Sequence, residues 1–291
     1  MSLFAYDFMQ RALLGVLITG LAAPALGIYL VQRRMALIGD GIGHVALTGV
    51  GLGLLTSRSP VITAVVVSAL GAVAVELIRE RGKASGDIAL ALLFYGGISG
   101  GVFLVALAAG KTNANLMAYL FGSPLTTSRE DLVVMAVLGG VVLAVTLLLR
   151  PWLFAICQDE EYARVAGLPV RALNLLLAVT TAVTVTVAMR AVGLLLVSAM
   201  MVVPVAAAQL VTRGFRATMH LAMVLGVAAA AVGIWIAAEY DTAPGATIVL
   251  VAIAAFSVLA TGAAVWRTAR RRAGAVGVDG EAEPPEVVLQ P

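Results

Sequence analysis

The sequence predicts an all-α protein that crosses a membrane several times, and two observations carry this prediction. Hydrophobic residues make up 61% of the chain and charged residues only 12%, with a mean hydropathy of +1.03. Soluble domains hold about 25% charged residues, so this chain falls outside their range. The apolar residues also gather in long, nearly charge-free runs. We therefore expect a polytopic helical bundle in the plasma membrane.

Nine apolar runs follow one another along the chain. They cover residues 12–32, 41–57, 59–75, 88–110, 132–149, 172–189, 191–212, 217–238 and 242–266. Most are close to the roughly 20 residues that a membrane-spanning helix needs, so about nine transmembrane helices are expected. The apolar start lacks a small-residue cleavage site, and the first helix is expected to stay in the protein.

The basic residues predict the orientation of these helices. Threading the chain through nine spans places fourteen Lys and Arg residues on one side and five on the other. The larger set is Arg33, Arg34, Arg79, Arg81, Lys83, Arg150, Arg164, Arg171, Arg213, Arg216, Arg267, Arg270, Arg271 and Arg272. Cytoplasmic loops collect Lys and Arg, so the N-terminus should lie outside and the C-terminus inside. This asymmetry explains the net charge of +3 without a nucleic-acid partner.

The chain divides at Trp266 by composition. Residues 1–266 are expected to form one transmembrane domain, and the basic run Arg267–Arg272 should fix the last helix by contact with anionic lipid. The residues that follow, up to 291, are rich in Gly, Pro and acid. We expect residues 267–291 to be a basic stop segment with a disordered cytoplasmic tail.

Two apolar runs contain residues that disfavour helix. One holds Gly39, Gly41 and Gly43, and the other holds Pro204 in mid-span. Paired interrupted helices are typical of transport pathways, because unwound backbone is tolerated in a membrane only where it lines a cavity or protein. The alternative is that glycine lets helices approach closely, and this is the preferred interpretation for "YGGISGG" at residues 95–101.

The stretch "LIGDGIGHVALTG" places an acid and a histidine inside one of these runs. Counting from Arg34, Asp40 lies about 9 Å and His44 about 15 Å into the membrane, one helical turn apart. An Asp near mid-bilayer costs on the order of 3 kcal/mol on insertion scales, so it needs a partner or a function. A hydrogen-bonded pair that holds helices together is one explanation, and an ion pathway is the favoured one. Met200 and Met201 are expected to fill the core rather than to bind metal.

The longest connection between spans, residues 151–171, has helix signals of its own. Asp159, Glu160 and Glu161 suit a helix N-terminus, and Gly167 followed by Pro169 ends it. A short helix on the inner face is predicted. It is either a solvated connector or a docking element for a partner.

Four stretches resemble a known family over about residues 8–266. They are "VQRRMALIGDGIGHVALTGVGLG", "YLFGSPLTT", "DEEYARVAGLPVRALNLLL" and "VGLLLVSAMMVVPVAAAQL". They are similar to the membrane subunits of ABC-type zinc, manganese and iron uptake systems, and closest to the zinc uptake permeases. The resemblance implies a homodimeric permease that receives a divalent cation from an extracytoplasmic binding protein and binds two cytoplasmic ATPase subunits.

The resemblance also implies roles for particular residues. Asp40 and His44 would line the cation path, and a dimer would offer two carboxylates and two imidazoles. Such a set suits zinc, manganese or ferrous iron, with zinc favoured by the likeness, and the metal would be cargo rather than a bound cofactor. The segment Asp159–Pro169 would be the coupling helix that docks on the ATPase. Its named residues are Asp159, Glu160, Glu161, Ala166, Gly167, Leu168 and Pro169.

Two other functions are alternatives for this sequence. "GISG" at residues 97–100 resembles the nucleophile motif of rhomboid intramembrane proteases, with Ser99 as nucleophile. His44 lies at a similar depth to Ser99, but His220 lies about 11 Å shallower and the rest of that pattern is missing. An ion-coupled secondary transporter is the second rival, and it would not need the long cytoplasmic segment. No phosphate-binding loop motif occurs, so ATP hydrolysis is expected in a separate subunit and the chain is not expected to be an enzyme.

Overall fold

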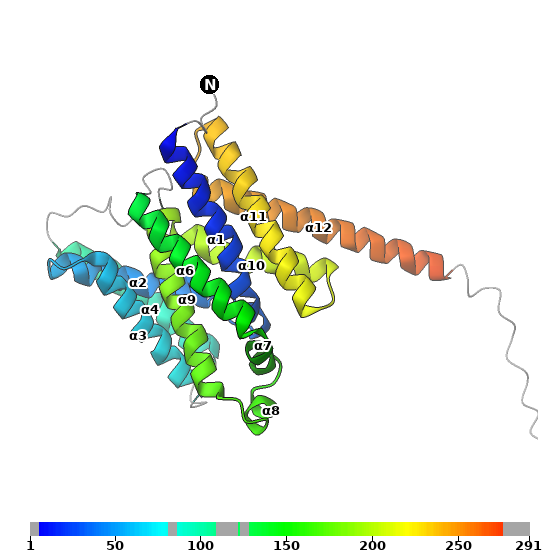
Figure 1. The fold of residues 1–291 in the computed structure, drawn as a ribbon, viewed down its shortest axis with the longest axis horizontal. Coiled ribbons are helices and arrows are strands. Elements are labelled where there is room, and N and C mark those ends of the chain that lie inside the picture. Colours follow the sequence, from blue (N-terminus) through cyan, green and yellow to red (C-terminus); the bar gives the residue numbers. More distant parts are fainter. Residues whose placement is uncertain (1–5, 81–85, 109–121, 123–127, 276–291) are drawn as a thin grey trace, which may run out of the picture.

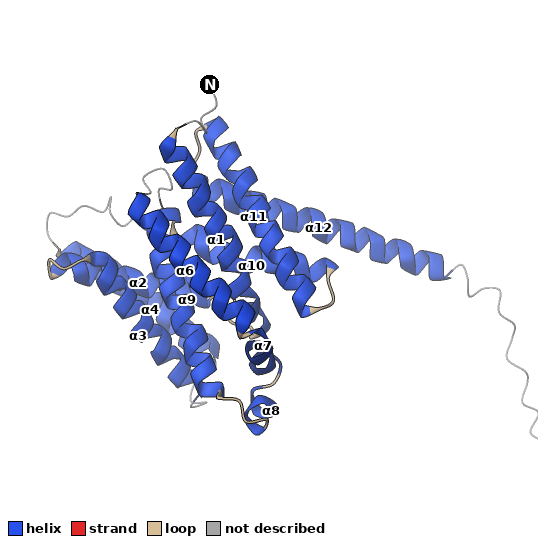
Figure 2. Ribbon diagram, viewed as in Figure 1, coloured by secondary structure: helices blue, strands red, loops and turns tan. Residues whose placement is uncertain are grey.

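The computed structural model describes residues 6–80, 86–108, 122 and 128–275, which form helices joined by turns, with no strand among them (Figures 1 and 2). The helices are α1 (Asp7–Gln32), α2 (Ile38–Leu55), α3 (Pro60–Glu80), α4 (Gly86–Leu107), α6 (Arg129–Leu148), α7 (Arg150–Gln158), α8 (Glu160–Val165), α9 (Val170–Val192), α10 (Leu194–Val211), α11 (Phe215–Tyr240) and α12 (Pro244–Ala275). The all-α fold class is confirmed. Apart from Gly122, the "YLFGSPLTT" motif lies outside the described residues, as does the tail from 276.

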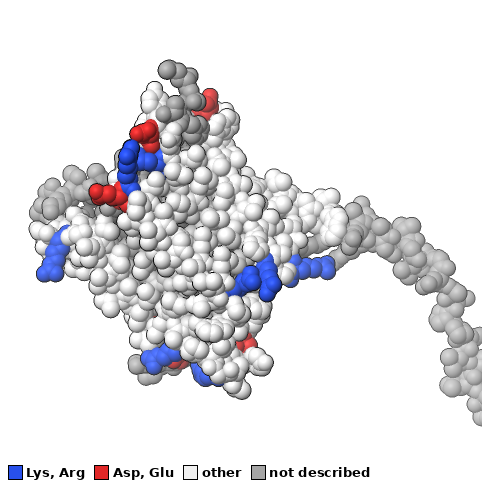
Figure 3. All heavy atoms as spheres, viewed as in Figure 1, with Lys and Arg blue, Asp and Glu red and all other residues white. Residues whose placement is uncertain are grey.

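Within the described residues, nine helices are long and apolar enough to cross a membrane, as predicted. The two others, α7 and α8, follow α6 and precede α9 in the chain, and they lie at one end of the bundle (Figure 1). Most of the visible face of the molecule carries no charged side chain, and Lys and Arg gather in groups near its margins (Figure 3). This surface suits an apolar surrounding with water at the two ends.

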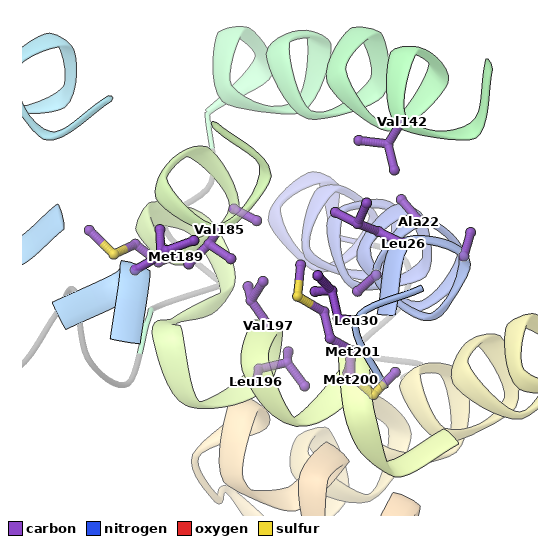
Figure 4. Packing of buried hydrophobic residues seen from close by; sticks show 14 of the residues in the cluster. Ala22, Leu26, Leu30, Val142, Val185, Met189, Leu196, Val197, Met200 and Met201 are labelled. Carbon is purple, nitrogen blue, oxygen red and sulfur yellow. The ribbon is translucent and has the colours of Figure 1, made fainter. Parts of the chain in front are cut away.

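A well-buried part of the bundle lies where α1 packs against α10 and α11. Gly27 of α1 faces the Met201 carbonyl of α10 so closely that a Cβ at Gly27 would overlap it. Leu26, Val197 and Met201 fill the space beside this contact (Figure 4). Met201 is surrounded by apolar side chains and is only 1% exposed. This burial agrees with the expectation that Met201 fills the core. Close backbone approach through small residues is the usual way in which helices associate inside a membrane.

Helix α2 is continuous from Ile38 to Leu55, so the predicted interruption at its glycines is wrong. The glycines allow close contact instead: a Cβ at Gly41 would lie 3.1 Å from Leu93 Cδ2, and one at Gly49 would lie 2.5 Å from the Cα of Ala64 on α3. Gly43 would likewise collide with the Leu194 side chain. Breaking the helix would leave backbone N–H and C=O groups without hydrogen-bond partners in an apolar layer. This cost keeps α2 helical through its glycines.

Helix α10 also runs through its predicted break. Pro204 is buried inside the helix, which is assigned without a gap from Leu194 to Val211. The chain does break at Gly193, which has a φ of 86° and ends α9 where α10 begins. A positive φ suits glycine because it has no Cβ to clash with the backbone. The backbone therefore leaves the helical path at Gly193, at the N-terminal end of α10, and not at Pro204.

Helix α12 extends past Trp266 through the basic run to Ala275. Ala and Arg are good helix formers, and no Gly or Pro stops the helix between Trp266 and Ala273. Only its first half packs against α10 and α11, with Ile248 and Ala252 buried, and the second half projects away from the bundle (Figure 1).

Candidate functional site

The first turns of α2 carry the predicted acid and histidine. Asp40 lies in the first turn and His44 one turn later, and His44 Nε2 is 3.9 Å from Asp40 Oδ2. The side chain of His44 is 8% exposed and that of Asp40 is 32% exposed. The structure therefore brings the two predicted residues together, with the imidazole inside the bundle and the carboxylate at its edge. At 3.9 Å they are close neighbours without a direct hydrogen bond.

Neighbouring helices complete the surroundings of this pair. The ring of Phe94 on α4 meets the His44 imidazole edge to face, with centroids 4.4 Å apart. Ser198 on α10 directs its Oγ to Asp40 Oδ1 at 3.4 Å, and donates a better hydrogen bond to the Leu194 carbonyl at 2.9 Å. Neither Ser198 nor Phe94 was among the predicted site residues. Ser198 could have been found from the sequence, because it is a polar residue within an apolar run. Nothing in the sequence indicates that Phe94 contacts His44.

The pair has unused binding capacity. His44 Nδ1 is buried and makes no hydrogen bond with any described residue. The described residues contain no group of three or more His, Cys, Asp or Glu side chains that could hold a metal ion. A structural metal site in a protein usually closes around four ligands. One copy of the chain therefore offers an open pair of one oxygen and one nitrogen donor, with the Ser198 hydroxyl beside it.

The arrangement that the rival protease function would need is absent from the described residues. Ser99 is exposed on α4, two residues after Gly97, whose face packs against the α2 backbone. Residues two apart on a helix point in nearly opposite directions, so Ser99 is turned away from His44. His220 is exposed on α11. Neither histidine stands as a base beside the serine.

The short helix predicted between the spans is α8, and its ends follow the predicted signals. Asp159 is the N-cap residue, and its Oδ1 accepts hydrogen bonds of 2.9 Å from the backbone N–H groups of Glu161 and Tyr162. Gly167 follows the helix with a φ of 82°. The Gly167 N–H donates a hydrogen bond to the Arg164 carbonyl, and the Leu168 N–H donates one to the Ala163 carbonyl. Both ends are thus fixed locally, as expected of a rigid projection.

The surface of α8 is largely open. Val165 is 88% exposed and Tyr162 is 69% exposed. Among the residues predicted for coupling, Asp159, Glu161, Ala166, Gly167 and Pro169 are also exposed. Leu168 packs against the core instead. Two apolar side chains on a short exposed helix form a surface that a partner protein could cover.

Glu160, like the buried Ala163, is turned from this helix toward the bundle. It accepts hydrogen bonds from Arg33 of α1 and Arg79 of α3, and a longer one of 3.3 Å from Asn174 of α9. Burial opposes ionisation of this carboxyl, but the hydrogen bonds and positive charges of Arg79 and Arg33 outweigh it and hold the pKa of Glu160 below its ordinary value. Glu160 is therefore ionised at neutral pH.

The part of the chain that the structure describes holds nine apolar spans, an open acid–imidazole pair within one of them and a projecting helix. Together these features define a multi-pass transport subunit of the membrane. Comparison with known families agrees. The model of the ABC 3 transport family matches residues 5–262, and the chain belongs to that family. It is accordingly a permease subunit of an ABC transporter in the plasma membrane, and not itself an enzyme.

Curated relatives carry three different metals in their names. The chain is 33% identical to "Manganese transport system membrane protein MntC" of Halalkalibacterium halodurans, covering 88% of this chain and 87% of the relative. It is 34% identical to "Chelated iron transport system membrane protein YfeD" of Yersinia pestis, covering 85% and 83%. It is 29% identical to "High-affinity zinc uptake system membrane protein ZnuB" of Haemophilus influenzae, covering 84% and 94%.

A solved structure has the same fold. The chain superposes on a chain of PsaBC from Streptococcus pneumoniae in complex with Fab with a TM-score of 0.77 and 28% identity, covering 87% of this chain and 91% of that one. The helical arrangement described above is therefore the arrangement of an ABC permease. The family resemblance inferred from the four sequence motifs is confirmed.

Proposed function

We propose that this chain is the permease of an ABC importer that moves a divalent first-row transition-metal cation into the cytoplasm. The observation that carries the proposal is the Asp40–His44 pair in the membrane, with a buried imidazole nitrogen that no described residue satisfies. Carboxylate and imidazole suit manganese, ferrous iron and zinc alike. The names of the relatives support a metal cargo and do not favour zinc over the other two.

Two copies of the chain would complete the site. A single copy offers two strong donors, which is fewer than any of these cations takes. Asp40 is one-third exposed at the edge of the bundle, where a second copy could add its own pair. A cation would then meet two carboxylates and two imidazoles near a dimer axis. Such a site would hold the cation for passage rather than permanently.

The ATPase subunits would dock on α8. The exposed Tyr162 and Val165 give this helix an apolar contact, and its capped ends make it stiff enough to pass on a movement. An extracytoplasmic binding protein would deliver the cation at the opposite end of the bundle. An ion-coupled secondary transporter would need neither partner, and this difference separates the two functions experimentally.

Transport should be measured in proteoliposomes that contain the chain, its ATPase and its binding protein. We expect ATP-dependent uptake of at least one of Mn²⁺, Fe²⁺ and Zn²⁺, and no uptake when the ATPase is omitted. The matched control is an ATPase variant that binds ATP without hydrolysing it. Uptake that continues with this variant and follows a proton or sodium gradient would establish secondary transport instead.

Replacement of Gly167 by Val should uncouple α8 from its partner. Nothing lies within 4 Å of a Cβ placed at Gly167, so the change acts through its φ of 82° and not through a clash. A side-chain-bearing residue pays about 1–2 kcal/mol in this left-handed region. We expect several-fold lower uptake with normal membrane insertion, measured in the same proteoliposomes.

Gly167→Asn is the matched control, because Asn tolerates the left-handed region better than other residues with a Cβ. It should retain most of the uptake. Equal loss in both variants would indicate that side-chain contacts at this position, rather than backbone conformation, matter.

A further inference from the structure

Four charged side chains and one amide meet where α1, α3, α8 and α9 come together. Arg79 donates hydrogen bonds to Glu76 at 2.7 and 3.1 Å and to Glu160 at 2.7 Å. Arg33 donates to Glu160 and lies 3.8 Å from Glu76. Asn174 adds its amide to Glu160. We refer to these five residues as the ion cluster.

The ion cluster is electrically balanced and shielded from solvent in part. The side chains of Arg33 and Glu76 are 6% and 5% exposed, those of Arg79 and Glu160 are 24% and 29% exposed, and two arginines face two glutamates. Buried charges are costly unless every charge has partners, and removing one of them leaves another without compensation. Movement of Glu160 away from the arginines therefore carries a penalty, which ties the position of α8 to those of α1 and α3.

Arg33 links the ion cluster to the candidate metal site over a short length of chain. It is the C-cap residue of α1, and the turn that follows is held by hydrogen bonds from Arg34 N–H to the Val31 carbonyl and from Met35 N–H to the Leu30 carbonyl. Helix α2 then begins at Ile38, and Asp40 lies in its first turn.

Helix α3 gives a second connection to α2. The backbones of these helices touch where Gly49 and Gly53 of α2 face Ala64 and Pro60 of α3. A shift of α3 at Glu76 and Arg79 would therefore move α2 as well, because a contact this close cannot be compressed. Both arginines that hold Glu160 belong to elements that position the helix carrying Asp40 and His44.

We propose that Glu160 is a positioning residue, which links the docking helix α8 through Arg33 and Arg79 to α2, the helix that carries Asp40 and His44, and so couples ATP hydrolysis to cation passage. Glu160 then acts inside the permease, and the exposed side chains of α8 contact the ATPase. This inference rests on the proposed function, since it assigns the route by which the ATPase acts on the cation path.

The Glu160→Gln variant tests this proposal, because it keeps the size of the side chain and removes its charge. Metal ions transported per ATP hydrolysed should be measured in proteoliposomes with the ATPase and the binding protein. We expect ATP hydrolysis to stay within about twofold, and transport per ATP to fall about fivefold or more, the range of typical coupling free energies. Unchanged transport per ATP would overturn the proposal.

Glu80→Gln is the matched control. Glu80 lies at the end of α3 and forms an ion pair with Arg171 of α9, which is longer at 3.4 Å and more exposed on its arginine side, where the Arg171 side chain is 67% exposed and that of Glu80 35%. Exposed pairs contribute little, so transport per ATP should change by less than about twofold. An equal loss in Glu80→Gln would show a general effect of charge at this end of the bundle and would overturn the specific role of Glu160.

A double variant, Glu160→Gln with Arg33→Gln, separates coupling from independent damage. If the two residues act as one link, the double variant should lose about as much transport per ATP as the worse single variant. Losses that multiply would overturn the proposal. Loss of the ATPase from purified Glu160→Gln complexes would also overturn it, because Glu160 would then belong to the docking surface.

The conservative Glu160→Asp variant keeps the test open if Glu160→Gln does not insert. Its carboxylate retreats by one methylene, so transport per ATP should fall with the charge retained, and an unchanged value would overturn the proposal. The wild-type chain is measured in parallel. Absence of ATP-dependent uptake by the wild type would contradict the proposed function, whereas normal wild-type uptake with a fully coupled Glu160→Gln variant would contradict only this inference.

Discussion

Exchange of Asp40 for Asn should stop metal uptake by the assembled transporter. The substitution keeps the size and the hydrogen-bonding capacity of the side chain, so its 3.4 Å contact with Ser198 can persist. It removes the negative charge that a divalent cation needs when it leaves water. Loss of even an indirect partner of a metal ligand costs roughly 10–100-fold, and loss of a ligand should cost more. The measurement is uptake of Mn²⁺, Fe²⁺ and Zn²⁺ in proteoliposomes.

His44→Gln should have a comparable effect, because a primary amide is a much poorer ligand for these cations than imidazole. The buried Nδ1 and the ring contact with Phe94 would both be lost, so thermal stability should be measured beside uptake. Ser99→Ala is the matched control: Ser99 is exposed on the neighbouring helix, and its replacement should leave uptake unchanged.

Normal uptake of all three metals by the Asp40→Asn, His44→Gln double variant would contradict a role in the cation path. The pair would then serve only to pack α2 against its neighbours. Loss of uptake in Ser99→Ala with the double variant unaffected would point away from the Asp40–His44 pair altogether.

The number of spans could be predicted from the sequence because the bilayer acts as a uniform constraint. Each apolar run must form a helix of sufficient length, whatever its neighbours are. The ends of α8 could be predicted for a similar reason, since capping by Asp159 and the positive φ of Gly167 are local effects. Such features depend on residues within one turn of each other and need no knowledge of the packed structure.

The continuity of α2 and α10 could not be predicted in this way. Gly and Pro disfavour helix in water, but in a membrane the cost of unpaired backbone groups outweighs that preference. Whether a glycine breaks a helix or lets another helix approach depends on its neighbours. Gly49 and Gly27 each face the backbone of another helix.

The inward orientation of Glu160 could not be predicted for a related reason. Sequence spacing fixes the relation of Glu160 to Glu161 on one helix, and both suit a first turn equally. Only the packed structure places Arg33 and Arg79, 127 and 81 residues away, beside one of them. The same holds for Ser198, which reaches Asp40 from a helix 158 residues further along the chain.

The glycines of α4 allow a sharp test of the packing that supports the metal site. Gly96 and Gly97 are adjacent, and the sequence motif treats them alike. A Cβ at Gly97 would lie 2.5 Å from Val45 N and 2.6 Å from His44 C, both backbone atoms of α2. At Gly96 nothing lies within 4 Å of such a Cβ. One methyl group therefore has opposite consequences at two neighbouring positions.

Gly97→Ala should destabilise the protein, because no flexible side chain can move aside and α2 itself must shift. Overpacking of this kind typically costs about 1–3 kcal/mol. The shift displaces His44 directly, so uptake should fall together with the thermal melting temperature in detergent. Gly96→Ala should leave both unchanged or raise the melting temperature, since Ala is a better helix former than Gly by about 1 kcal/mol. Equal behaviour of the two variants would contradict the close approach of α4 to α2, and with it the geometry that holds His44 against Phe94.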